Sequence, residues 1–138
     1  MNSKRLVLAT ISYVVLTMAI AYPWHMIWFH SLYGEMGAYT RPEPSIPLGM
    51  LSMLVQGVVI AYLYPFYYRS GNPVLHGIKF SFLIGAVVYS VMGFAMAAKI
   101  DINPISSYLL YSAFFQLLQF ILTGAALGLI YGKINQVA

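Results

Sequence analysis

The sequence has very little charge and no cysteine. Seven Lys and Arg and three Asp and Glu make up 7% of its 138 residues, whereas hydrophobic residues make up 61%. Because a typical soluble domain carries about 25% charged residues, this composition excludes both a soluble globular protein and a disordered chain. The absence of cysteine excludes disulfides, thiolate catalysis and metals bound by cysteine.

The sequence does contain four long apolar runs, at 6–29, 46–68, 77–98 and 105–131. A helix needs about 20 mostly apolar residues to cross the hydrocarbon core of a bilayer, and each run reaches that length. The segments between the runs are too short to hold an extramembrane domain of about 50 residues. We therefore expect an all-α membrane protein in which residues 1–138 form a single membrane domain. The expected architecture is an antiparallel four-transmembrane-helix bundle made of two helical hairpins.

The basic residues predict how the bundle is oriented. An even number of spans places both termini on one side, and Lys and Arg are enriched in cytoplasmic segments. Only Arg41 and Lys99 fall on the side away from the termini, so we expect both termini to be cytoplasmic. The basic residues on the other side are Lys4, Arg5, Arg69, Lys79 and Lys133. They are scattered at span ends and form no single face, so we expect the partner surface to be a lipid bilayer and not nucleic acid. Tyrosines near the cytoplasmic ends, such as Tyr64 and Tyr131, are expected at headgroup depth.

The fourth span carries glycine at every fourth position, as Gly124, Gly128 and Gly132. This GxxxG spacing leaves a bare helix surface that lets a second backbone approach closely, which drives helix association in lipid. The surface is typical of packing against another span of the same bundle, for instance the third. It is also suited to a contact with a second copy or with another subunit, so we expect a homo-oligomer or a larger membrane complex.

Polar side chains at bilayer depth form a second stripe on the same span. Gln56 and Gln119 lie near the centres of the second and fourth spans, and their side-chain amides are able to bond each other. Ser52, Ser112, Gln116 and Thr123 would complete a polar midplane network. Such a network is typical of hydrogen bonds between helices, worth about 0.6 kcal/mol each. The alternative is a polar path for a small neutral solute, with no ionisable group to couple transport to ions.

Histidine and methionine gather at the predicted outer end. Met26 lies one helical turn before His30, and thioether with imidazole suits Cu(I). His25 differs from His30 by about 140° around the helix, so the two rings do not point at one ion. Met is also an ordinary filler of apolar gaps, as the others in the outer half would be: Met36, Met50, Met53, Met92 and Met96. Met26 and His30 are therefore the candidate metal ligands, and we otherwise expect no cofactor.

The chain resembles the small bacterial four-helix integral membrane proteins that are grouped as a domain of unknown function. The resemblance lies in the length, the four spans, the run from Gly124 to Ile130 and the cluster Tyr22-Pro23-Trp24. It implies the fold and a bacterial inner membrane, and it implies no activity. A general acid–base pair would have to come from the outer rim, and no nucleophile motif lies near that rim. We therefore expect that the protein is not an enzyme. The sequence favours a non-catalytic packing or accessory subunit of a membrane assembly. The alternatives are a small-solute permease and an outer-leaflet copper-binding protein.

Overall fold

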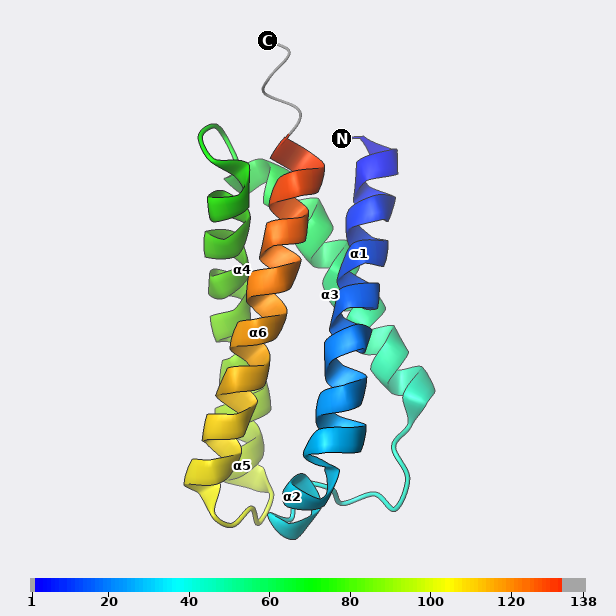
Figure 1. Ribbon diagram of the computed structural model, residues 1–138, viewed down its shortest axis with the longest axis vertical. Coiled ribbons are helices and arrows are strands. Elements are labelled where there is room, and N and C mark those ends of the chain that lie inside the picture. Colours follow the sequence, from blue (N-terminus) through cyan, green and yellow to red (C-terminus); the bar gives the residue numbers. More distant parts are fainter. Residues whose placement is uncertain (1, 133–138) are drawn as a thin grey trace.

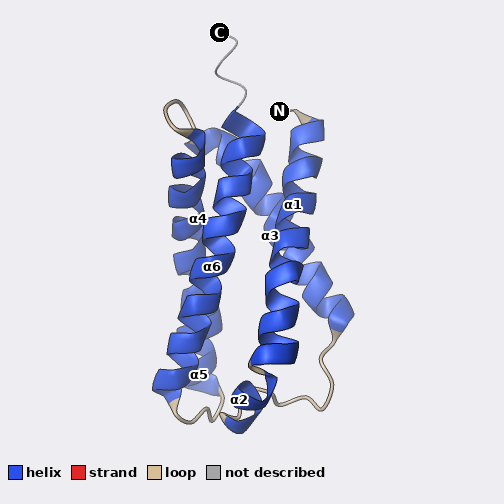
Figure 2. Cartoon of the chain, in the orientation of Figure 1, coloured by secondary structure: helices blue, strands red, loops and turns tan. Residues whose placement is uncertain are grey.

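The computed structural model describes residues 2–132, and all regular structure within that range is helical (Figures 1 and 2). Four helical segments are long and apolar enough to cross a membrane, as the hydrophobic runs predicted. They are Ser3–Trp28, Ile46–Tyr67, Pro73–Lys99 and Ile105–Tyr131. Lys133, which we counted among the cytoplasmic charges, lies outside the described residues.

Two of the four spans change helix type along their length. The first consists of α1 (Ser3–Tyr22) and a π-helical segment, Pro23–Trp28, and is followed by the short α2 (His30–Glu35). The third consists of α4 (Pro73–Tyr89), a π-helical segment, Ser90–Ala95, and α5 (Met96–Lys99). The other two spans are α3 (Ile46–Tyr67) and α6 (Ile105–Tyr131). Pro23 explains the first change, because it has no N–H to donate to the carbonyl of Ala19.

The third span begins four residues before its apolar run. The side chain of Asn72 accepts a hydrogen bond from the backbone N–H of Leu75 at 3.1 Å, and Pro73 occupies the first helical position. An asparagine cap followed by proline is a favourable helix start, so the helix begins in the polar turn. Gly71, with φ of +92°, supplies the left-handed residue that this turn between α3 and α4 requires.

The helices pack most extensively in the pair α4 and α6, and α1 packs against both α3 and α6. Figure 1 shows α3 crossing obliquely behind α1. The start of α1, the turn between α3 and α4 and the end of α6 lie at one end of the bundle, which we call the termini end. Helices α2 and α5, with the connections that follow them, lie at the opposite end, which we call the loop end.

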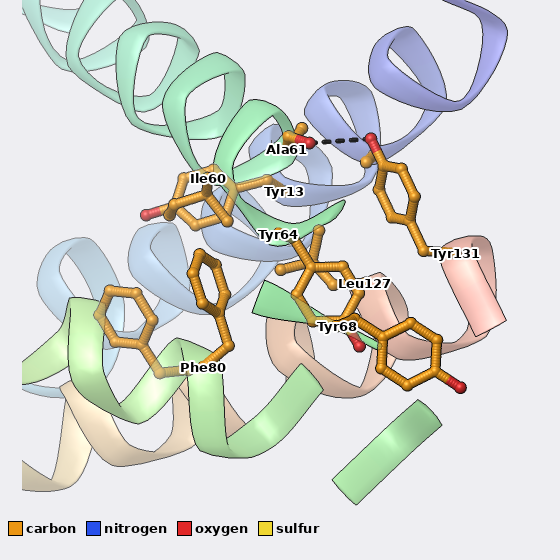
Figure 3. Close-up of a cluster of buried hydrophobic side chains, with 10 residues drawn as sticks. Tyr13, Ile60, Ala61, Tyr64, Tyr68, Phe80, Leu127 and Tyr131 are labelled. Carbon is orange, nitrogen blue, oxygen red and sulfur yellow. Dashed lines mark hydrogen bonds between the residues drawn. The ribbon is translucent and has the colours of Figure 1, made fainter. Parts of the chain in front are cut away.

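The core of the termini end is built from tyrosines whose hydroxyls bond backbone carbonyls. Tyr131 donates to the carbonyl of Ala61 at 2.9 Å (Figure 3), and Tyr64 donates to the carbonyl of Pro73 at 3.1 Å. Both side chains are buried, with exposed fractions of 2% and 0%. Both rings therefore pack inside the bundle, where each hydroxyl finds its acceptor, and their depth in the membrane stays a prediction.

Candidate functional site

A chain of hydrogen bonds joins three helices at mid-depth, and Tyr13 of α1 is its centre. The Tyr13 hydroxyl donates to Oε1 of Gln56 on α3 at 2.6 Å and accepts from Nε2 of Gln119 on α6 at 3.0 Å. Nε2 of Gln119 also donates to the hydroxyl of Thr17 at 3.1 Å. We expected the two glutamines to bond each other, whereas the structure places a tyrosine between them.

The outer members of this network complete its bonding. Nε2 of Gln56 donates to the Ser52 hydroxyl at 3.0 Å, and the Thr123 hydroxyl donates to the backbone carbonyl of Gln119 at 2.8 Å. These two bonds lie within α3 and α6, whereas the bonds made by Tyr13 and Thr17 tie α1 to both helices, and a network of this kind stabilises a bundle. Sequence reasoning missed Tyr13 and Thr17 as members. The available signal was their spacing: Tyr13 and Thr17 lie four residues apart on the first span, as Gln119 and Thr123 do on the fourth span.

The remaining two predicted members, Ser112 and Gln116, lie outside this network. They line an aromatic cavity of about 180 Å³ near the loop end. The wall comes from the first π-helical segment, the α2 region, the end of the third span and the first half of α6. Its residues are His25, Tyr33, Ala38, Tyr39, Tyr89, Met92, Met96, Tyr108, Ser112, Phe115 and Gln116.

Gln116, which lines this cavity, carries an unsatisfied hydrogen-bond acceptor. Its Oε1 atom is buried and has no hydrogen-bond partner among residues 2–132. An unpaired buried acceptor costs about 1–3 kcal/mol, so native proteins supply such an atom with a donor from protein, water or ligand. Gln116 thus marks the aromatic cavity as a place where a donor group would be bound.

The rings around Gln116 are held by bonds to the backbone. Tyr39 donates to the carbonyl of His25 at 3.0 Å, and Tyr108 donates to the carbonyl of Met92 at 2.6 Å. Both acceptors lie in π-helical segments, which occur frequently at functional sites. The His25 ring contacts the Phe115 ring edge-on with centroids 4.6 Å apart. The hydroxyls of Tyr39 and Tyr108 are thus bound to carbonyls, whereas the Tyr33 hydroxyl accepts from Nε1 of Trp24 at 3.3 Å.

Tyr39 separates the aromatic cavity from a second one. Burial, with the nearby tyrosines at 33 and 108, raises the pKa of Tyr39 to about 12. On its other side lies a loop cavity of about 340 Å³, lined by Met26, His30 and the segment after α2. Both candidate metal ligands thus face one space. Within the part of the chain that the structure describes, no three His, Cys, Asp or Glu side chains gather at a point.

Three of the other methionines line different spaces from Met26 and His30. Met92 and Met96 line the aromatic cavity, and Met50 lines a hollow between α1 and α3. His25 lines the aromatic cavity whereas His30 lines the loop cavity, in agreement with their angular separation on the helix. The set of soft ligands expected from the sequence is therefore divided among separate places.

The glycine face of α6 is occupied by α4 of the same chain. A Cβ on Gly124 would lie 2.7 Å from the carbonyl oxygen of Gly77, and one on Gly128 would strike the carbonyl of Pro73. A Cβ on Gly132 would strike the Pro73 ring. Of the two alternatives for this surface, the structure shows packing within the bundle. Docking of a second copy at this face stays a prediction, and it would require α4 to move off the glycines.

Comparison with family models, with curated proteins and with solved structures found no match to this chain. The resemblance to small bacterial four-helix membrane proteins therefore stays a prediction.

Proposed function

We propose that the protein binds a small, uncharged molecule in the aromatic cavity, and that this molecule donates a hydrogen bond to Gln116. The observation that carries the proposal is the buried, unpaired Oε1 of Gln116, a residue that lines a cavity walled by aromatic rings. None of the described residues that line the cavity is Asp, Glu, Lys or Arg, which favours an uncharged ligand. The proposal includes no catalytic step.

The size of the cavity favours a ligand with one substituted ring. Apolar cavities of about 150 Å³ accommodate benzene, and the aromatic cavity measures about 180 Å³. The rings of Phe115 and Tyr108 offer the edge-on and offset contacts that aromatic ligands prefer. A phenol combines such a ring with a donor for Gln116, so 4-bromophenol is a suitable probe.

Trp24 provides a direct readout of binding. Its ring lies 6.0 Å from the Phe115 ring, centroid to centroid, next to the cavity wall. The second tryptophan, Trp28, is 66% exposed and would add background fluorescence. In the Trp28→Phe variant reconstituted in lipid nanodiscs, we expect 4-bromophenol to quench Trp24 fluorescence in a saturable manner.

A matched probe and a matched variant isolate the hydrogen bond. 4-Bromotoluene has nearly the shape of 4-bromophenol but no donor, so we expect it to bind more weakly. A neutral hydrogen bond contributes about 0.5–1.5 kcal/mol, which corresponds to roughly 2- to 12-fold in affinity. In Gln116→Leu the difference between the two probes should vanish. Quenching that never saturates would refute the proposal. So would a preference for 4-bromophenol over 4-bromotoluene that is the same in Gln116→Leu as in the parent protein.

A second candidate is the permease expected from the sequence. The polar residues of α6 continue from the aromatic cavity at Gln116 to the midplane network at Gln119, and this continuity favours a path between them. Transport of a small neutral solute into proteoliposomes tests this candidate. Gln119→Leu should abolish flux if the path is used, whereas a binding protein would lose only stability.

The other expectations from the sequence continue as proposals. An accessory role in a membrane assembly needs a docking surface other than Gly124, Gly128 and Gly132, or needs α4 to move off these glycines, since α4 covers that face. Cytoplasmic placement of the termini end is supported by the distribution of basic residues, and a bacterial inner membrane is supported by the resemblance alone. Copurification from native membranes tests the accessory role, because a stoichiometric companion supports it and a solitary species contradicts it.

A further inference from the structure

A third cavity, distinct from the loop cavity, lies directly beside the aromatic cavity and is more apolar. It is a groove of about 220 Å³ between α4 and α6, lined by Phe82, Gly85, Ala86, Ala113, Leu117 and Phe120 together with two residues named below. Phe82 and Leu117 are 40% and 43% exposed on the outside of the bundle. In a membrane protein such a surface faces the acyl chains, so the groove opens to lipid.

Gln116 and Tyr89 line both the groove and the aromatic cavity. These two side chains therefore lie between a cavity with polar groups in its wall and an apolar groove. Tyr89 is anchored by one hydrogen bond, from its hydroxyl to the carbonyl of Leu109 at 2.8 Å. Its ring rests on Gly93, where an added Cβ would lie 2.9 Å from the ring. Gln116, whose Oε1 is buried without a partner among the described residues, thus lines both spaces.

We propose that the ligand is an uncharged amphiphile whose hydroxylated ring occupies the aromatic cavity and whose hydrocarbon tail lies in the groove between α4 and α6. This inference rests on the proposed function and adds the tail and its place. The ligand's hydroxyl must reach Gln116, and its tail must leave the aromatic cavity past Gln116. The hydroxyl and the tail are therefore attached to neighbouring carbons of the ligand's ring. The class is therefore a 2-alkylphenol, which reaches the site from the bilayer.

The tail contributes little affinity by burial, because lipid chains are as apolar as the groove. What the groove supplies is space, without which a tailed ligand is unable to place its ring in the aromatic cavity. Filling the groove should consequently exclude the tailed ligand and spare a tailless one. Ala86 on α4 and Ala113 on α6 line the groove but not the aromatic cavity, so both are suited to this test.

The experiment measures displacement of 4-bromophenol from the Trp28→Phe protein in nanodiscs, read as recovery of Trp24 fluorescence. Phenol and 2-octylphenol are compared at equal mole fraction in the bilayer. Both should displace the probe from the parent protein. In Ala86→Leu we expect the midpoint for 2-octylphenol to rise by about tenfold or more while that for phenol stays within about twofold. Ala113→Leu, from the opposite wall, should behave likewise.

Ala19→Leu is the matched control, since Ala19 is an exposed alanine on α1 that lines neither space. It should leave both midpoints unchanged. The inference is overturned if both groove variants leave 2-octylphenol unaffected, or if both weaken phenol to the same extent. Failure of 4-bromophenol to quench the parent protein would instead remove the proposed function, and this inference with it. The two failures are therefore distinguishable.

Discussion

Replacing Gly77 with alanine should destabilise the bundle, because α4 and α6 touch there through their backbones. A Cβ on Gly77 would strike the carbonyl oxygen of Gly124 and would lie 2.8 Å from the backbone nitrogen of Gly128. No side-chain rotation relieves contacts with backbone atoms, so the two helices would have to move apart. The pair α4 and α6 is the most extensive helix contact in the described chain, and separation would loosen it along its length.

The size of the effect follows from two opposing terms. Overpacking of a filled interior costs about 1–3 kcal/mol, and exchange of glycine for alanine within a helix returns up to about 1 kcal/mol. We therefore expect Gly77→Ala to lower the free energy of unfolding by about 1–2 kcal/mol. Gly49→Ala is the matched control, since a Cβ there meets nothing within 4 Å. This control should be neutral or should stabilise α3 by about 0.5–1 kcal/mol.

Unfolding by sodium dodecyl sulfate in mixed micelles, followed by circular dichroism, measures both variants against the parent protein. The expected order of stability is Gly49→Ala, parent, Gly77→Ala. A Gly77→Ala protein as stable as the parent would show that α4 and α6 do not approach this closely. Equal destabilisation by both substitutions would show that loss of glycine itself, and not the contact, is responsible.

Three further predictions address the network, the loop end and the orientation. Tyr13→Phe removes the hydroxyl that joins two glutamines and should cost about 1 kcal/mol of unfolding free energy, measured in mixed micelles, whereas an unchanged value would exclude a stabilising role for that hydroxyl. Tyr39, with its pKa raised to about 12, should contribute stability that is present below pH 10 and is lost as the pH rises through 12, because its folded pKa exceeds that of the unfolded chain. A difference titration of tyrosinate absorbance against Tyr39→Phe checks this, and titration near 10 would contradict it. Since the chain lacks cysteine, Thr40→Cys and Ser70→Cys form a clean pair for labelling of intact cells with an impermeant maleimide. Only the first should react, and the reverse would invert the proposed topology.

The number and extent of the spans could be predicted from the sequence because the bilayer dictates the length of an apolar helix. The fourth span has the bounds that the apolar run gave, 105–131. The third begins earlier, at Pro73, because a local capping bond from the Asn72 side chain extends the helix into a polar turn. Hydropathy alone does not register such a bond, and the residues Asn72 and Pro73 did carry the signal.

The partners of the polar side chains could not be predicted, because a stripe on one helix does not fix which neighbour it faces. Gln119 meets Tyr13 and Thr17 on α1, and only the rotation and spacing of the helices decide this. Gln116, one turn earlier on the same stripe, meets a cavity instead. Pro23 marks the first π-helical segment in the sequence. No comparable residue marks the second, Ser90–Ala95, so that segment could not be predicted.

At both ends of the bundle, tyrosine hydroxyls away from water are satisfied by bonds to backbone carbonyls, but the consequences for packing differ. At the termini end the tyrosine hydroxyls bond carbonyls of other elements, and the rings fill the space between the helices. At the loop end, Tyr39 and Tyr108 bond carbonyls within π-helical segments, which holds their rings at the cavity wall. A wall that is fixed by bonds to its own backbone does not need contents in order to persist, so the space it surrounds is available to a ligand. Because the hydroxyls of Tyr39 and Tyr108 are already bound to carbonyls, we expect the side-chain amide of Gln116 to be the group that selects a ligand.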